Sequence, residues 1–135
     1  VVFLLNITKV GKNVFYCASN LVVVDIPEGI TIIGDLSFYR CISLKDIKFP
    51  KSLTSIGEES FCDCSSLEEV DLLHTNVLEL GKFAFDGCTS LREMKVPDSL
   101  QDFEINVFYN CPKLFPFDIN DRDNEAVVAY LRSIQ

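Results

Sequence analysis

The sequence repeats itself about every 23 residues, and this repetition constrains the fold more than any other feature. Division of the chain at a recurrent leucine gives four consecutive units, residues 21–43, 44–66, 67–90 and 91–113. A fifth unit begins at Leu114, and a partial one precedes Leu21. A unit this short cannot bury its own apolar face, so successive units must stack and share one core.

Equivalent positions in the units carry the same types of residue. Three such columns are Phe15, Phe38, Phe61, Phe85 and Phe108; Cys41, Cys64, Cys88 and Cys111; and Gly11, Gly34, Gly57 and Gly81. Stacking places equivalent residues about 4.8 Å apart, so we expect ladders of Phe and Leu in the core. Glycine is expected to supply backbone freedom at a tight corner. The one extra residue of the third unit falls around His74-Thr75-Asn76, where we expect a loop to bulge.

The residue pattern within each unit also predicts its secondary structure. Asp46-Ile47-Lys48-Phe49 alternates polar and apolar residues, which indicates a half-buried strand. Thr54-Ser55-Ile56 indicates a second, brief strand, and the acidic start of segment 58–64 favours one or two helical turns. The repeat therefore predicts an α/β solenoid over residues 1–120, with about five units of strand, turn, short strand and helical turn.

The last residues of the chain depart from the repeat. Asp123 and Asn124 are good N-cap residues, and Val127, Val128 and Leu131 form an apolar stripe at helical spacing. Because stacked repeats need a cover for their open end, we expect a capping helix within residues 121–135. The start of a linker to a following domain is the alternative.

These columns resemble the BspA-like leucine-rich repeats, whose unit reads roughly L-x-x-I-x-I-P-x-x-(V/L)-x-x-I-G-x-x-x-F-x-x-C-x-x-L. The matching residues of one unit are Leu44, Ile47, Phe49, Pro50, Leu53, Ile56, Gly57, Phe61, Cys64 and Leu67. The resemblance extends from about residue 10 to residue 114. It implies a right-handed α/β leucine-rich-repeat solenoid, a role in adhesion or protein binding, and a cell-surface or secreted location. The family carries no catalytic motif, so the resemblance implies neither an enzyme nor a cofactor.

The net charge of -8 bears on the partners of such a chain. Nucleic acids and anionic membrane surfaces need clustered Lys and Arg, so both are disfavoured. No apolar run approaches the ~20 residues that span a membrane, which argues against membrane insertion. Another protein with a basic surface is the expected partner. Solubility alone also explains an acidic composition.

The residues that carry chemistry in other proteins have structural interpretations here. Four of the six cysteines share one inward column, where they are expected to be small buried hydrophobic residues rather than disulfides. Cys17 and Cys62 lie outside this column, where side chains can be exposed. Cys62-Asp63-Cys64 lacks the second cysteine pair of a zinc site, so no metal is predicted. His74 is the single histidine, and no nucleophile has a visible base partner.

The outward positions of the predicted strands form two columns on one sheet. The first is Val23, Asp46, Glu69, Glu93 and Pro116, and the second is Asp25, Lys48, Asp71, Lys95 and Asp118. The second column alternates in charge and is expected to neutralise itself. Because the first holds three consecutive acids, which disfavour stacking, we expect this stripe to contact a basic or polar partner. Random placement in an acidic chain is the alternative.

A further column of candidate contacts lies one residue after each phenylalanine. It contains Tyr16, Tyr39 and Tyr109 together with Cys62 and Asp86. Tyrosine is favoured at interfaces because it offers both contact area and a hydrogen bond. The alternative is that these rings merely cover the edge of the phenylalanine ladder.

The N-terminal end shows no predicted cap. The apolar segment 1–7 reads as a strand that another unit should cover, so either preceding repeats are missing or the end pairs with a second copy to form a homodimer. The chain opens on Val1 rather than Met, and we expect it to be part of a longer polypeptide. Asn6-Ile7-Thr8 is a glycosylation sequon.

Taken together, these features predict a protein-binding or adhesive module that is not an enzyme. Two alternatives stay open. The first alternative is a structural spacer within a larger repeat protein. The second is a hydrolase that uses surface carboxylates.

Overall fold

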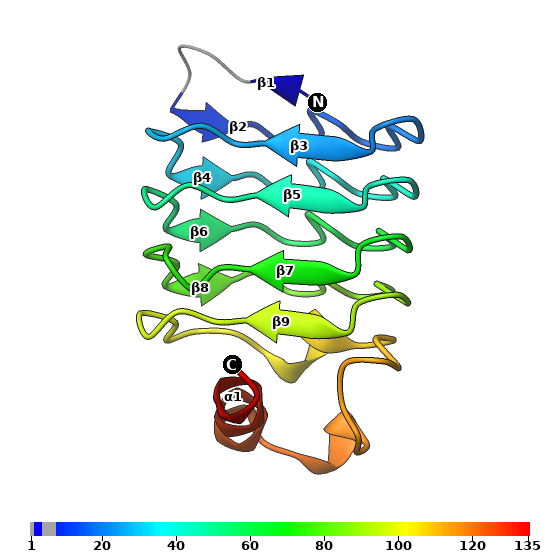
Figure 1. Cartoon of the computed structure of the whole chain (residues 1–135), viewed down its shortest axis with the longest axis vertical. Helices are drawn as coiled ribbons and strands as arrows, with labels where there is room; N and C mark the ends of the chain where they lie inside the picture. Colours follow the sequence, from blue (N-terminus) through cyan, green and yellow to red (C-terminus); the bar gives the residue numbers. More distant parts are fainter. Residues whose placement is uncertain (1, 4–7) are drawn as a thin grey trace.

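The computed structural model describes residues 2–3 and 8–135. The chain winds into stacked coils with short parallel strands on two opposite sides (Figure 1). The front face carries β1 (Val2–Phe3), β3 (Val23–Asp25), β5 (Asp46–Lys48), β7 (Glu69–Asp71) and β9 (Glu93–Lys95). The back sheet carries β2 (Lys9–Val10), β4 (Ile32–Ile33), β6 (Ser55–Ile56) and β8 (Glu79–Leu80). The predicted solenoid is confirmed, and it has about four turns.

Segment 58–64 was predicted to be helical, and it forms turns instead. Glu59 and Asp63 hold left-handed backbone conformations with φ of 53° and 58°. The backbone N–H groups of Glu59, Phe61 and Asp63 donate to carbonyl oxygens of the next coil, at Lys82, Ala84 and Asp86. A helix over this segment would instead need the Asp63 N–H for a bond to the Glu59 carbonyl oxygen, four residues earlier. The turns therefore make a third hydrogen-bonded ladder along the stack.

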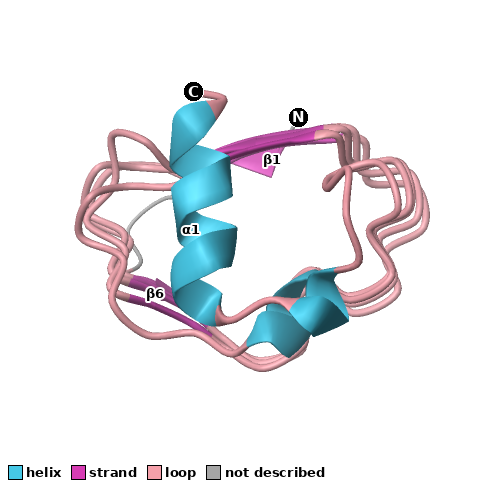
Figure 2. Cartoon of the chain, turned by 90° about the horizontal axis from the view of Figure 1, so that it is seen from below, coloured by secondary structure: helices cyan, strands magenta, loops and turns pink. Residues whose placement is uncertain are grey.

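Phenylalanine and leucine ladders fill the interior, as the repeat predicts. Successive Phe rings stack with centroid separations of 5.2 Å, 5.1 Å, 5.3 Å and 6.4 Å between Phe15 and Phe108. Leu44, Leu67 and Leu91 are fully buried beside them. Seen along the stack in Figure 2, the coils superpose around this common interior.

The glycine column has a different cause from the one expected. Gly34, Gly57 and Gly81 lack the positive φ that would require glycine. A Cβ at Gly57 would lie 2.6 Å from the Asp35 nitrogen, and one at Gly81 would lie 2.4 Å from the Glu58 nitrogen. These glycines are therefore required by close approach of the preceding coil rather than by backbone freedom.

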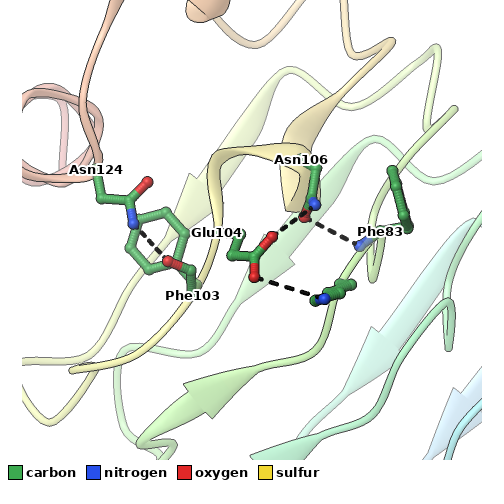
Figure 3. Close-up of polar contacts among 6 residues, drawn as sticks. Phe83, Phe103, Glu104, Asn106 and Asn124 are labelled. Atoms are coloured by element: carbon green, nitrogen blue, oxygen red, sulfur yellow. Dashed lines mark hydrogen bonds and ion pairs between the residues drawn. The ribbon is translucent and has the colours of Figure 1, made fainter.

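The last coil replaces the column glycine with Glu104, and side chains there take over contacts that backbone makes elsewhere (Figure 3). Between η1 (Ile105–Phe108) and the coil above, the Asn106 Oδ1 atom accepts from the Phe83 N–H at 3.5 Å. The Asn106 amide donates to Glu104, whose carboxylate lies 3.8 Å from the Lys82 ammonium. The equivalent turn nitrogens of earlier coils use backbone carbonyls.

A helix covers the C-terminal end, as predicted. Asp123 caps the N-terminus of α1 (Asn124–Ser133), and its carboxylate accepts from the Ala126 N–H at 2.8 Å. Val127 and Leu131 are fully buried against the last coil, while Val128 is half-buried. The Gln135 side chain accepts from the Val96 N–H at 2.6 Å, which covers a backbone donor just beyond β9. The helix therefore lies across the C-terminal end of the stack (Figures 1 and 2).

The fifth unit keeps its leucine but not its strand. Leu114 is buried, yet Pro116 and Asp118 lie outside any strand. Proline cannot donate to a ladder, and the Asp118 carboxylate instead accepts from the Asn120 N–H at 2.9 Å and caps η2 (Ile119–Asp121). The two predicted columns on the front face therefore end at β9.

The N-terminal strand pairs with the stack, with Val2 opposite Val24 and Phe3 opposite Asp25. Positions 1 and 4–7, which include the Asn6 sequon and most of the segment expected at this end, lie outside the described residues. No helix within the described residues combines the length and the apolar composition needed to cross a membrane.

Candidate recognition face

The front face presents the two predicted columns side by side. Val23 is opposite Asp46 and Glu69 is opposite Glu93 in the first column. Asp25 is opposite Lys48 and Asp71 is opposite Lys95 in the second. The intervening residues Val24, Ile47, Val70 and Met94 are buried, so period-two alternation leaves the charged side chains outward.

The acidic column is partly neutralised by a residue that the sequence interpretation overlooked. The Arg92 guanidinium lies 3.0 Å from a Glu69 oxygen and 3.6 Å from a Glu68 oxygen. Asp46 and Glu93 have no ion pair within 4 Å to any of the described residues. The signal was present, because Arg92 directly precedes β9 and stacks beside Glu68 at the same place in the repeat. Negative charge nevertheless remains in excess along this column.

The second column alternates in charge without close ion pairs. Among the described residues, Asp25, Lys48, Asp71 and Lys95 form no pair within 4 Å. The Asp71 carboxylate accepts from the Leu73 N–H at 3.0 Å and so supports the turn that holds the inserted residue. These groups therefore attract one another through solvent, at the weak level typical of exposed charges.

The front sheet is interrupted between β5 and β7. β1, β3 and β5 form one sheet and β7 and β9 form another, although the back sheet runs unbroken through β2, β4, β6 and β8. The gap between β5 and β7 is visibly wider than those between the other front strands (Figure 1). A cavity of about 370 Å³ lies here, lined by Asp46, Ile47, Lys48, Phe49, Asp71, His74 and Thr75. We call it the β5–β7 cleft.

The tyrosine column lies on the third side of the solenoid, away from the cleft. Tyr16 and Tyr39 stack with ring centroids 5.0 Å apart, and Tyr16 is 49% exposed. Tyr109 contacts the edge of Phe83 at 6.3 Å instead of another tyrosine. Because buried Cys62 and half-buried Asp86 separate Tyr39 from Tyr109, the three rings do not form one continuous patch.

The cysteines form a ladder of free thiols. The thiols of Cys41, Cys64, Cys88 and Cys111 donate to the carbonyl oxygens of Phe15, Phe38, Phe61 and Phe85 at 3.1–3.2 Å. Burial raises the pKa of the Cys41 thiol to about 11 and that of the Cys111 thiol to about 12. Cys17 is exposed, but the expectation of exposure is wrong for Cys62, which is 7% exposed and has a pKa of about 12 for the same reason.

Other cavities lie on the described part of the molecule, including one of about 220 Å³ lined by Phe108, Pro112 and Phe115 among others. One of about 360 Å³ on the back sheet has a lining that includes Asp35, Glu58, Glu79, Lys82 and Asp102. Another of about 530 Å³ lies between α1 and the last coil. No group of three His, Cys, Asp or Glu residues in the described part of the chain is arranged to hold a metal ion. The β5–β7 cleft is the cavity that the predicted front-face residues Asp46, Lys48 and Asp71 share.

Solved leucine-rich-repeat proteins share this fold. The chain is 28% identical to a leucine-rich-repeat protein of T. pallidum, with a TM-score of 0.77 over 80% of this chain and 50% of that one. It is 27% identical to a leucine-rich cell surface protein of Faecalibacterium prausnitzii, with a TM-score of 0.80 over 84% of this chain and 30% of that one. A leucine-rich-repeat protein of Bacteroides ovatus is 32% identical, with a TM-score of 0.68 over 84% of this chain and 35% of that one.

The chain thus spans half or less of the length of these proteins. No curated protein matches it. The family model described as a BspA type leucine-rich-repeat region matches residues 6–127 in six copies, so the partial unit before Leu21 counts as a repeat. Family and fold are those of repeat scaffolds rather than of enzymes. The chain belongs to the BspA-type leucine-rich-repeat family.

Proposed function

We propose that this chain is a protein-binding module whose front face receives a basic segment of a partner protein. The observation that supports this most strongly is the pairing of Glu69 with Glu93 on neighbouring strands. Like charges at this spacing disfavour the folded stack, and Arg92 is shared between Glu69 and Glu68. A partner that brings cations to the column would relieve the remaining repulsion and gain specificity from charge complementarity.

Adhesion at a cell surface is the setting that we propose for this binding. One structural relative is described as a leucine-rich cell surface protein. Repeat solenoids suit such a role because their stacked strands present an extended, rigid surface.

A structural spacer is the second candidate. The chain spans only 30–50% of the length of its structural relatives. This favours a spacer, because the partner contacts of such proteins can lie in the remaining repeats. A spacer predicts no partner whose binding depends on the front-face charges.

Affinity capture from cell extracts, with matched charge variants, separates the two. The test variant combines Asp46→Lys, Glu69→Lys and Glu93→Lys. The control combines Glu58→Lys, Glu79→Lys and Asp102→Lys on the back sheet side, which changes the net charge equally. We expect a partner that the unaltered chain and the control retain and the front-face variant loses.

The captured partner should also elute at moderate salt, because exposed charges are screened within about 10 Å at 0.1 M ionic strength. If both variants retained the same partners, the front face would not be the binding surface. Capture of nothing by any of the three chains would favour the spacer.

A further inference from the structure

The interruption of the front sheet leaves two facing strand edges without the ladder that joins their neighbours. Backbone N–H groups of Lys45 and Asp46 donate to Val22, and those of Arg92 and Glu93 donate to Glu68. The equivalent bonds from Glu68 and Glu69 to the coil above do not form in the described part of the chain. Backbone polar groups along β5 and β7 are therefore available to another donor or acceptor.

Two departures from the repeat lie at this interruption. Phe49 occupies the position that Ile26, Leu72 and Val96 fill elsewhere, and it is half-buried where those residues are buried. Its ring meets Phe61 edge-on at 5.8 Å rather than joining the Phe ladder. The inserted residue follows β7, where the Thr75 hydroxyl donates to the Leu72 carbonyl oxygen and fixes the turn that carries His74. An oversized ring and an extra residue thus occur where the strands part.

The cleft has an apolar floor and a charged rim. Ile47 and Phe49 form the floor, while Asp46, Asp71, Lys48 and His74 line the rim. Its volume of about 370 Å³ is near the lower end of the range for pockets that hold small molecules. The back-sheet cavity is also lined by acids, together with Lys82, but it lies beside strands β6 and β8, which already pair with each other. The cavity beside α1 is bordered by both Glu125 and Arg132.

We propose that the β5–β7 cleft receives an arginine side chain of the partner protein. This inference rests on the proposed function, because it names the anchor by which a basic segment binds the front face. An arginine stem can cover Ile47 and the Phe49 ring. Its guanidinium presents five N–H donors in one plane, suited to the carboxylates of Asp46 and Asp71 and to carbonyl oxygens on the open edges.

The lysine on the rim does not cancel this preference. Lys48 is the register partner of Asp25 on β3, so a second carboxylate borders it on the side away from the cleft. Asp71 is held by its bond from the Leu73 N–H, which uses one oxygen and orients the other. Two carboxylates against one ammonium leave the rim acidic. A neutral isostere of arginine would therefore bind much more weakly.

The test is a titration of the isotopically labelled chain, followed by amide NMR. The probes are N-acetyl-arginine-N-methylamide and its citrulline counterpart, which keeps the shape but not the charge. We expect saturable shifts confined to residues 46–49 and 71–75 with the arginine probe. Citrulline should bind roughly tenfold more weakly or worse, because a charge-assisted hydrogen bond is replaced by a neutral one.

Variants identify the contacts. Asp71→Asn should weaken arginine binding roughly tenfold, and Phe49→Val should weaken it by removing the floor. Asp102→Asn, an equal loss of charge on the back sheet side, should leave it unchanged. The amide spectrum of each variant reports its folding, and Asp46→Asn replaces Asp71→Asn if the latter disturbs the turn.

Equal shifts with citrulline, or shifts spread over the acids of the back sheet, would overturn the proposal. So would cleft shifts produced by maltose but not by arginine, which would indicate a carbohydrate site. Because the titration needs no partner, its outcome is independent of the capture experiment. If the capture experiment succeeded and the arginine titration failed, the acidic column would be the binding surface and the cleft would have no part in it.

Discussion

Two positions four residues apart hold a left-handed backbone that L residues rarely adopt, in every described coil except the last, which keeps only the second position. The non-glycine members have φ between 53° and 59°, and they are Asn13, Cys17, Leu36, Arg40, Glu59, Asp63, Phe83 and Asn110. Such a conformation costs about 1–2 kcal/mol per residue. The turn ladder holds it in place, for example through the bond from the Arg40 N–H to the Cys62 carbonyl oxygen at 2.8 Å. Gly87 meets this demand without strain, and asparagine and aspartate, as at Asn13, Asp63 and Asn110, tolerate it better than the other residues.

Substitution at Arg40 tests whether this conformation is costly. Arg40→Gly should be as stable as the unaltered chain or up to about 1 kcal/mol more stable, because glycine removes the strain but adds entropy to the unfolded chain. Arg40→Val should lose about 1–2 kcal/mol, since a β-branched residue fits this region poorly. Urea unfolding measures both. A valine variant at least as stable as the glycine variant would refute the argument.

At the scale of elements, the strands pair unequally, although their sequences predict equal repeats. The back sheet pairs β6 with β8 through Ser55 opposite Glu79 and Ile56 opposite Leu80. On the front face the same two coils have no such pairing. The interruption therefore belongs to one side of the solenoid.

Hydrogen exchange should reveal that interruption. The amides of Glu68, Glu69 and Phe49 should exchange faster than their counterparts one coil earlier, Lys45, Asp46 and Ile26, which donate to carbonyl oxygens. Residue-resolved amide exchange by NMR measures the ratio. Equal protection in the two coils would mean that β5 and β7 are paired in solution.

The sequence predicts the repeated elements well and the exceptions poorly. Alternation at Asp46-Ile47-Lys48 locates the strand, and the pattern at Val127 and Leu131 locates the helix. The turns of segment 58–64 were misjudged because inter-coil bonds outweigh the helical preference of an acidic start. The neutralising role of Arg92 was missed because it lies just outside the strand.

The candidate site was predicted only in part. Columns place Asp46, Lys48 and Asp71 on one face, but a periodic pattern assumes that every coil pairs equally with the next. The cleft arises where that assumption fails, at Phe49 and the inserted residue near His74. The available signal was Phe49. It is an aromatic residue at a repeat position that Ile26, Leu72 and Val96 fill in the other units.

At the scale of the whole molecule, the buried thiols couple folding to alkaline pH. The pKa rises from 9.0 to about 11 for Cys41 and to about 12 for Cys62 and Cys111. Between the pKa of a thiol in the unfolded chain and its higher pKa in the folded chain, the folded chain binds more protons than the unfolded chain. The free energy of unfolding therefore decreases as pH rises. This contribution is intact below about pH 9 and is lost as pH rises through about 11 and 12.

Urea unfolding at several pH values from 8 upward should show this decline. Cys62→Ala removes a titrating thiol for which no hydrogen bond is found among the described residues, and its stability should fall less steeply with pH than that of the unaltered chain. Parallel slopes for the two proteins would show that other groups cause the alkaline loss.

The one-sided interruption also has a mechanical consequence. Two ladders cross from the second full coil to the third, in the back sheet and along the turns, while the front strands there are not joined. Bending that widens the front at this place breaks no ladder bond, so we expect the solenoid to bend more readily here than between its other coils. A load pulling on the front face would be taken up first by curvature at this joint, where an anchored side chain would act as a wedge.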